Sequence, residues 1–268
     1  MRTFEFPAPP VIEQARIATS LGALDDKINS NHRMAALLEE AAATLFRGRF
    51  VDPHPFEGNG GDQPEQWTEG SIGDLASAYR ETITADSGLP YIGLNEMPRG
   101  STILSKWLAE GAPEGQANRF SPGDILFGKL RPYFRKVGMA LIDGRCSTEI
   151  LVLRPRDERY WGFVFGHVAS QAFIDHCVAV SRGTRMPRAE WKDASSFPVR
   201  VPPPETVGEH TQIVQDLYAK IRSLVMESRT LSAVRDALLP KLVSGEIRVP
   251  NTDDPEEAIG VVTDEVAE

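Results

Sequence analysis

The chain has 268 residues, 41% of them hydrophobic and 25% charged, with a formal net charge of -9 at pH 7. These values predict a soluble globular protein of one large domain or two modest ones, and the acidic balance argues against indiscriminate nucleic-acid binding. No apolar run approaches the roughly 20 residues that span a bilayer, and "MRTFEFPAPP" lacks the apolar core of a secretory signal, so we expect a cytoplasmic protein without membrane contact.

Residues 1–52 are predicted to form a first helical arm. Its seam positions alternate at spacings of four and three: Ile17, Leu21, Leu24, Ile28, Asn31, Ala35, Leu38, Ala42 and Leu45. This spacing is typical of a coiled coil, and the amide of Asn31 within an apolar seam favours pairing with a partner helix, because such residues set register. The alternative is an ordinary amphipathic core helix. The prolines of "FPAPP" lie ahead of the helix and are expected to fix its entry.

Residues 53–204 are predicted to form a mixed α/β domain. The segments "DILFGKLRPYF", "KVGMALID" and "TEILVLRP" are short and rich in β-branched and aromatic residues, with Gly, Pro and Asp between them. These features indicate short strands, whereas "YWGFVFGHVASQAFIDHCVA" indicates a helix.

The positive charge of the chain is concentrated in this domain. Residues 91–200 hold 16 Lys and Arg against 11 Asp and Glu, while the rest of the chain holds 13 against 27. Two stretches, "GDILFGKLRPYFRKVG" and "SRGTRMPRAEWKD", combine cations with aromatic, small or hydroxyl residues. Guanidinium groups bond phosphates and guanine edges bidentately, so both stretches are candidates for DNA contact. The alternative for any single Lys or Arg is a structural role at a strand edge.

The candidate DNA-contacting residues come from these two stretches, with one arginine from the segment before them. They are Arg99, Lys129, Arg131, Tyr133, Arg135, Lys136, Ser181, Arg182, Thr184, Arg185 and Arg188.

Other chemical interpretations of the domain are weaker. "GDILFGKL" matches the first seven positions of a phosphate-binding loop, but Leu130 replaces the hydroxyl residue that contacts magnesium. A metal-dependent nuclease or nucleotide-binding protein using Asp124 and Lys129 stays as an alternative. Cys146 and Cys177 have no metal-ligand spacing and are predicted to be buried free thiols. We expect no catalytic site, metal or cofactor.

Residues 205–248 are predicted to form a second helical arm, preceded by the prolines of "VPPPE". A shift of 196 residues from the first seam reaches Ile213, Leu217, Lys220, Leu224, Glu227, Leu231, Val234, Leu238 and Lys241. The two arms therefore look like copies. Residues 249–268 are predicted to be a disordered acidic tail, because the segment after Val249 holds seven acids and no base.

The predicted helix-pairing residues lie on both arms. They are Ile17, Leu21, Leu24, Ile28, Asn31, Leu38, Leu217, Leu224, Leu231 and Leu238.

Three motifs resemble the specificity subunits of type I restriction-modification enzymes. "LSAVRDALLPKLVSGEIRV" is similar to the family's C-terminal signature, and "EQARIATSLGALDDKINSNHRMAALLEEAAATLFRGRFVD" is similar to its central spacer helix. Between them, "GDILFGKLRP", "STEILVLRP" and "SRGTRMPRAEWKDASSFPVRVPPPE" resemble a target recognition domain. The resemblance covers all but the acidic tail and implies one target recognition domain flanked by two long coiled-coil helices.

The resemblance implies a non-catalytic subunit that recognises double-stranded DNA for a host-defence complex. Such subunits hold two recognition domains on paired helices, read a split sequence, and bind methyltransferase (modification) subunits and a restriction/translocase subunit. This chain departs from that pattern because it has one recognition domain, which implies a half-length form. We expect a homodimer or a complementary half-subunit. A coiled-coil protein scaffold is the remaining alternative.

Overall fold

The computed structural model describes residues 9–52, 67–84, 88–109 and 111–249. Its contacts divide the chain into two units, one formed by residues up to Leu37 together with those from Lys220 onward, the other by Leu38–Ala219. The predicted acidic tail lies outside the described residues from position 250 onward. Among the described residues, no single helix has the length and apolar composition to cross a membrane, and only the bent pair Glu158–Ala169 and Gln171–Val180 passes that test together.

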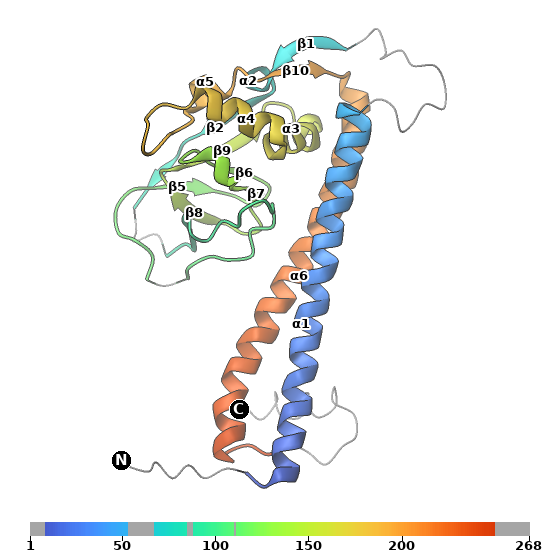
Figure 1. The fold of residues 1–268 in the computed structure, drawn as a ribbon, viewed down its shortest axis with the longest axis vertical. Helices are drawn as coiled ribbons and strands as arrows, with labels where there is room; N and C mark the ends of the chain where they lie inside the picture. Colours follow the sequence, from blue (N-terminus) through green and yellow to red (C-terminus); the bar gives the residue numbers. More distant parts are fainter. Residues whose placement is uncertain (1–8, 53–66, 85–87, 110, 250–268) are drawn as a thin grey trace, which may run out of the picture. The chain divides into compact units, whose positions relative to one another are not determined.

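Two long helices run through both units: α1, Val11–Phe46, and α6, Pro204–Ser244 (Figure 1). Each begins at or next to a proline cluster, where the missing N–H and the fixed φ of proline suit a first helical turn. After α6, Gly245 adopts φ +77°, the left-handed conformation that glycine supplies at helix ends. A short π-helical turn, Arg47–Val51, follows α1.

In the first unit the two helices pack antiparallel. An apolar cluster joins Ile17 of α1 to Leu238 and Leu242 of α6 and is closed by Ile247. Further along the pair, Asp25 accepts a hydrogen bond from Arg235 at 2.6 Å. The residue numbers of the contacting partners rise on one helix as they fall on the other, which fixes the antiparallel direction.

The predicted seam residues of α1 are mostly covered. Ile17, Leu24, Ile28 and Asn31 are buried, while Leu21 and Leu38 are half-buried.

The seam of α6 lies to one side of the predicted leucine repeat. Leu224 and Leu238 are buried, but Leu217 and Leu231 are only half-buried. Ile213, which the predicted repeat included, is 45% exposed. The buried stripe follows other positions of the helix: Val207, Thr211, Val214, Tyr218, Ile221, Val225 and Ser228. At 3.6 residues per turn these residues share one face, and the leucines at seven-residue spacing lie along its edge.

Among the described residues, the second unit contains three small sheets together with helices, which confirms the predicted mixed α/β class. One sheet has the order β2 (Ala76–Tyr79), β9 (Ile150–Pro155), β6 (Ile125–Gly128) and β7 (Val137–Met139), all antiparallel. The next has the order β3 (Thr82–Ile83), β5 (Ala117–Phe120), β8 (Gly144–Ser147) and β4 (Tyr91–Ile92), with β4 parallel to β8. The third pairs β1 (Thr68–Ser71) with β10 (Pro198–Val201).

Within the described part of this unit lie the α-helices α2 (Ile72–Leu75), α3 (Trp161–Ala169), α4 (Gln171–Val180) and α5 (Trp191–Ala194). The segment from 160 to 179 that the sequence predicted as one helix forms two, α3 and α4. Ser170 lies between them in an extended conformation, and its hydroxyl accepts a hydrogen bond from the Phe173 N–H at 3.2 Å. This N-cap ends one helix and starts the next.

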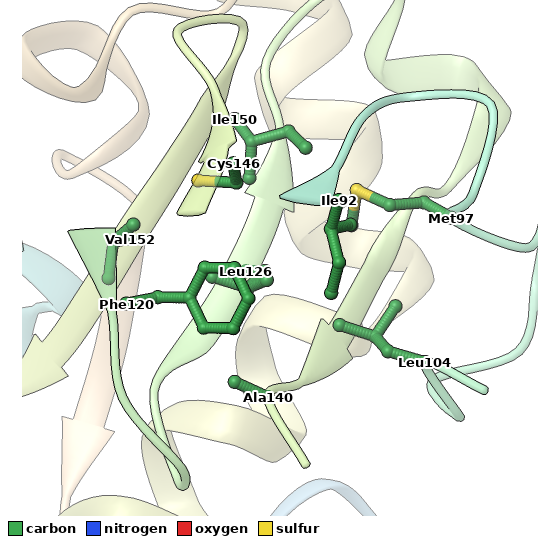
Figure 2. Packing of buried hydrophobic residues seen from close by; sticks show 9 residues of the cluster. All are labelled: Ile92, Met97, Leu104, Phe120, Leu126, Ala140, Cys146, Ile150 and Val152. Carbon is green, nitrogen blue, oxygen red and sulfur yellow. The ribbon is translucent and has the colours of Figure 1, made fainter. Parts of the chain in front are cut away.

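The core lies between the two four-stranded sheets. Figure 2 shows side chains from both, including Leu126 and Val152 from one sheet and Phe120 and Cys146 from the other. Their burial removes apolar surface from water, at about 25 cal/mol per Å². Cys146 and Cys177 are free and buried, as predicted, and burial raises the pKa of each thiol to about 12.

A second apolar cluster surrounds two histidines. The ring centroid of His167 lies 4.5 Å from that of Phe163 and 5.0 Å from that of Phe46, and His210 lies 4.8 Å from Phe50. Burial lowers the pKa of both imidazoles to about 4, with a further lowering of the His210 pKa by Arg49. Both rings are therefore neutral at pH 7.

Candidate nucleic-acid interface

The two basic stretches of the sequence lie against each other. Leu130 and Arg188 form an antiparallel bridge, and the Arg131 N–H donates to the Pro187 carbonyl at 2.7 Å. Backbone pairing therefore joins segments that are more than fifty residues apart in the chain. The interpretation that both stretches act on one ligand gains a geometric basis.

The second stretch turns back on itself as a tight hairpin. Arg182 and Arg188 exchange two backbone hydrogen bonds of 3.0 Å, which places residues 183–187 in the loop between them. Gly183 has φ +97°, a conformation that side chains other than that of glycine rarely adopt. Thr184 and Arg185 are exposed at the end of this loop.

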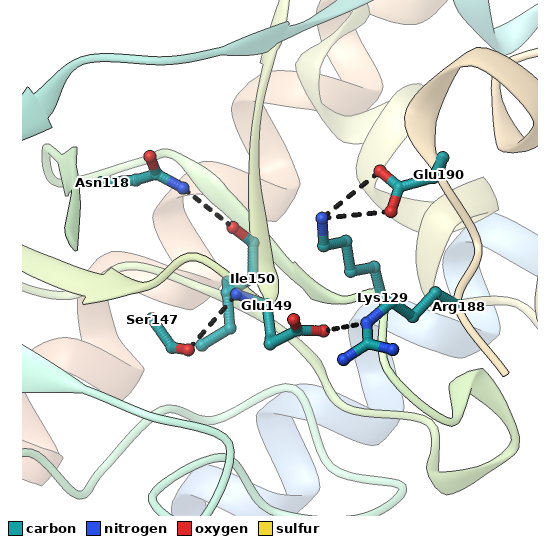
Figure 3. A network of polar contacts seen from close by, with 7 residues as sticks. All are labelled: Asn118, Lys129, Ser147, Glu149, Ile150, Arg188 and Glu190. Atoms are coloured by element: carbon teal, nitrogen blue, oxygen red, sulfur yellow. Dashed lines mark hydrogen bonds and ion pairs between the residues drawn. The ribbon is translucent and has the colours of Figure 1, made fainter. Parts of the chain in front are cut away.

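Two of the basic residues predicted to contact DNA form ion pairs with carboxylates within the domain (Figure 3). Lys129 Nζ lies 3.2 Å from the Glu190 carboxylate, and Arg188 Nε donates to Glu149 at 2.9 Å. The hydrogen bond from Arg188 to Glu149 raises the pKa of the guanidinium above its ordinary value. These ion pairs join residues 188 and 190 to residues next to the ends of β9 and β6.

Two more of the predicted basic residues also have partners within the domain. Arg182 forms an ion pair of 3.2 Å with Asp193, although most of its side chain is exposed. Lys136 donates from Nζ to the Leu94 carbonyl, and burial lowers the pKa of its ammonium group. The hydroxyl of Ser181 donates to the Val178 carbonyl at 2.8 Å, at the end of α4.

The first stretch carries a strained turn. A 3-10 turn at Pro132–Phe134 is bracketed by Arg131 and Arg135, whose φ angles of 52° and 51° are left-handed. Such conformations cost energy for residues other than glycine and cluster at ligand-binding sites. Tyr133 is 48% exposed on this turn.

Aromatic and cationic groups pack against one another at this turn. The Tyr133 and Phe134 ring centroids are 4.7 Å apart, and the Arg99 guanidinium lies 3.9 Å from the Phe134 centroid. The Gly100 N–H donates to the Arg135 carbonyl at 3.2 Å. Arg99 is thus in contact with the turn that follows Arg131.

The structure therefore separates predicted cations that form an ion pair with a carboxylate from those that do not. Within the described part of the chain, Arg135 and Arg185 are exposed and form no ion pair, and Arg131 has a buried Nε without a hydrogen-bond partner. Lys129, Arg182 and Arg188 are neutralised. Sequence reasoning did not assign these ion pairs, because Glu149 lies outside both basic stretches, while Glu190 and Asp193 were counted only as part of a basic segment.

The residues of the alternative nuclease or nucleotide site have other roles. The Asp124 carboxylate is buried and receives two hydrogen bonds from Arg154, at 2.6 and 2.7 Å, and one from the Ser121 N–H at 2.7 Å. The "GDILFGK" stretch lies on β6 instead of forming a loop that opens a helix, as a phosphate-binding loop requires. Among the described residues, no group of three or more His, Cys, Asp or Glu is placed to hold a metal ion.

Comparison with known proteins finds specificity subunits of type I restriction enzymes. No family model matches it. The type I restriction enzyme MjaIX specificity subunit of Methanocaldococcus jannaschii is 24% identical over 270 residues, which cover 93% of this chain and 62% of that protein. The type I restriction enzyme EcoDI specificity subunit of Escherichia coli is 28% identical over 134 residues, 48% of this chain and 30% of that protein.

A solved structure shares the fold. The type I restriction-modification S subunit from M. genitalium has a TM-score of 0.57 at 16% identity and covers 87% of this chain and 61% of its own. The chain spans less than two thirds of the length of each of these relatives. The resemblance to type I specificity subunits that the three motifs indicated is confirmed.

Proposed function

We propose that this chain is a non-catalytic DNA-specificity subunit of a type I restriction-modification system, acting in the cytoplasm without a cofactor. The observation that carries the proposal is the backbone pairing of the two basic stretches, which brings together two cation-rich segments in an acidic chain. The similarity to specificity subunits over 93% of the chain supports it.

Recognition is assigned to the exposed cations and the strained turn. Arg185, at the end of the hairpin loop, and Arg135, beside the turn, offer guanidinium forks free of ion pairs within the described residues. Tyr133 adds an exposed aromatic ring on the same turn as Arg135. Guanidinium forks distinguish guanine edges and also bind phosphates, so these groups supply both affinity and sequence preference. Lys129 and Arg188 position the hairpin through their ion pairs.

One recognition domain reads one half of a split DNA target. The second half is read by another recognition domain, which a second copy of this chain supplies as part of a two-fold homodimer. The two-fold arrangement is favoured because identical subunits close an assembly most simply in this way. A complementary half-subunit is the other source.

Methyltransferase subunits, and through them a restriction subunit, are proposed to bind the exposed sides of the long helices. In the first unit, Met34 and Leu37 of α1 are 47% and 60% exposed, on a helix whose other face is already paired with α6. Large apolar side chains that stay exposed after helix pairing are suitable anchors for a protein partner.

Methylation mapping tests the proposed function. Cells that carry the gene with a neighbouring methyltransferase gene are compared with cells in which this gene alone is deleted. We expect a split methylated motif that disappears on deletion. Purified chain with and without the methyltransferase is then tested for binding to DNA carrying that motif. Assembly with the methyltransferase but no DNA preference would instead indicate a coiled-coil scaffold, and cleavage or nucleotide binding that depends on Asp124 and Lys129 would indicate an enzyme.

A further inference from the structure

A buried arginine lies outside the two basic stretches. Arg145 of β8 is only 4% exposed, and its Nη1 makes one long hydrogen bond, 3.4 Å, to the Pro113 carbonyl. Its Nε is buried without any hydrogen-bond partner. Among the described residues, no carboxylate forms an ion pair with it. A buried charge is costly unless it is paired, so this group calls for a counter-charge.

A second arginine lies directly opposite on the neighbouring strand. Strands β5 and β8 are antiparallel, and their register pairs Arg119 with Arg145. Phe120 and Cys146, the next residues along each strand, point into the apolar cluster (Figure 2). Side chains alternate along a strand, so the two arginines point to the opposite face of the sheet.

The groups around this pair do not neutralise it. Like charges directly opposite in a sheet are destabilising. Arg119 has Asp143 at 3.6 Å, but that contact is largely exposed to solvent. On the other side of Arg145, the ring of Tyr91 lies 5.1 Å from the guanidinium carbon, as a cation–π contact that leaves the Nε proton unbonded. Two guanidinium groups thus share one sheet face, and the one carboxylate paired with them in the described part of the chain, Asp143, is largely exposed to solvent.

We propose that Arg119 and Arg145 form a binding site for a phosphate group. A phosphate between the two side chains would accept the unbonded Nε proton, neutralise the buried charge and relieve the repulsion between the opposed strands, because guanidinium forks match its oxygens bidentately. That this phosphate belongs to a DNA backbone rests on the proposed function. Free inorganic phosphate is the other source of the same chemistry.

A stability crossover tests the site itself. Thermal unfolding of the full chain is measured with increasing inorganic phosphate, at constant ionic strength maintained with chloride. We expect phosphate to raise the melting temperature of the wild type by several degrees. Arg145→Met removes an unpaired buried charge and should be at least as stable as the wild type without phosphate, yet gain nothing from phosphate. Arg119→Gln, at a half-exposed position, should also lose the phosphate response while folding normally.

Arg33→Gln is the matched control, since Arg33 is exposed on α1 and its change should leave the phosphate response intact. A purely structural Arg145 predicts a different pattern: Arg145→Met would be destabilised equally with and without phosphate. That pattern, or a wild type that does not respond to phosphate, overturns the inference.

DNA binding then identifies the source of the phosphate. If the site holds a DNA phosphate, Arg119→Gln should lower the slope of log K against log salt by about 1, uniformly across sequences. A phosphate response with an unchanged slope assigns the site to free phosphate. A wild type that responds to phosphate but binds no DNA would overturn the proposed function and leave the anion site standing.

Discussion

Asn31 Nδ2 donates a hydrogen bond to Glu227 Oε2 at 2.9 Å, and 196 residues separate the two positions. The same offset relates the two heptad seams of the sequence. Because α1 and α6 are antiparallel in this unit, equivalent positions of two copies can meet at only one point, where a local two-fold axis passes between them. If the arms are copies, this contact places the buried amide of Asn31 at that point.

Removing the Asn31 amide should loosen the register of the helix pair. Asn31→Leu with Glu227→Leu replaces a polar contact by apolar packing, so we expect equal or higher stability in urea but a loss of unique register, because buried polar pairs commonly serve that purpose. Asn31→Ala alone should cost about 1 kcal/mol. Disulfide trapping of cysteine pairs across the helices reports the register.

Asn29→Ala is the control for this pair, since Asn29 is exposed on the same helix. It should change stability by no more than about 0.5 kcal/mol. A double leucine variant that keeps a single register would remove the specificity role from this contact.

The hairpin loop offers a sharp test of DNA contact. Arg185→Ala should weaken specific DNA binding by about 1 to 3 kcal/mol if the residue touches a base, and lower the salt slope by about 1 if it touches a phosphate. Arg182→Ala, three residues earlier and paired with Asp193, should have a smaller effect. Fluorescence anisotropy at several salt concentrations measures both. Equal losses of DNA affinity for the two variants would contradict the division between arginines with and without an ion pair.

The buried histidines predict an acid-sensitive domain. His167 and His210 have folded pKa values of about 4, below the usual 6.5, so the unfolded chain binds more protons than the folded chain between these values. Stability should therefore be full above pH 6.5 and fall as the pH drops toward 4, by on the order of 2 kcal/mol for each histidine. Urea unfolding from pH 4.5 to 7.5 measures this.

His167→Gln should flatten part of that pH dependence, while His32→Gln, at an exposed position of α1, should leave it unchanged. Asp74 and Asp157, whose pKa values are lowered by hydrogen bonds to Ser71 and Arg159, contribute only below about pH 4 and do not obscure the window. Constant stability from pH 4.5 to 7.5 would show that the rings are hydrated in solution.

The exposed apolar residues of α1 give a test of partner binding. Leu37→Asp adds a charge at a position that is 60% exposed, so the chain should fold normally. Assembly with the methyltransferase should nevertheless weaken at least tenfold if Leu37 is an interface anchor, because the charge would be buried there. Val178→Asp on α4, at 41% exposure, is the matched control. Undiminished assembly of the Leu37 variant, measured by size-exclusion chromatography with light scattering, would place docking elsewhere.

Much of this architecture was predictable because periodicity and proline punctuation act locally. The heptads of residues 17–38 and the prolines before both helices indicated the long elements. The face of α6 was less visible, since Val214, Tyr218 and Ile221 form the buried stripe beside a more conspicuous leucine repeat. Composition also identified the basic stretches. Composition could not show which Lys and Arg side chains lack an ion pair, because their carboxylate partners are set by strand pairing.

The opposed arginines were missed for the same reason. Arg119 and Arg145 lie far apart in the sequence, and only the register of β5 and β8 brings them together. No local pattern marks either residue as unusual, since isolated arginines are common on strands. Their significance comes from burial, which depends on the whole domain.

The symmetry of the assembly can be tested through the methylated sequence. If the working particle contains two copies of this chain, identical recognition domains read both half-sites, so the methylated motif should be an inverted repeat around an unspecified spacer. One heptad inserted into each helix, between Ile28 and Leu38 and at the facing part of α6, keeps the antiparallel pairing in register. Seven helical residues add about 10 Å, or roughly three base pairs, so the spacer should lengthen while the half-sites stay unchanged. Methylation mapping of both versions measures the result. An asymmetric motif from the unmodified system would exclude the homodimer and indicate a partner with a different recognition domain.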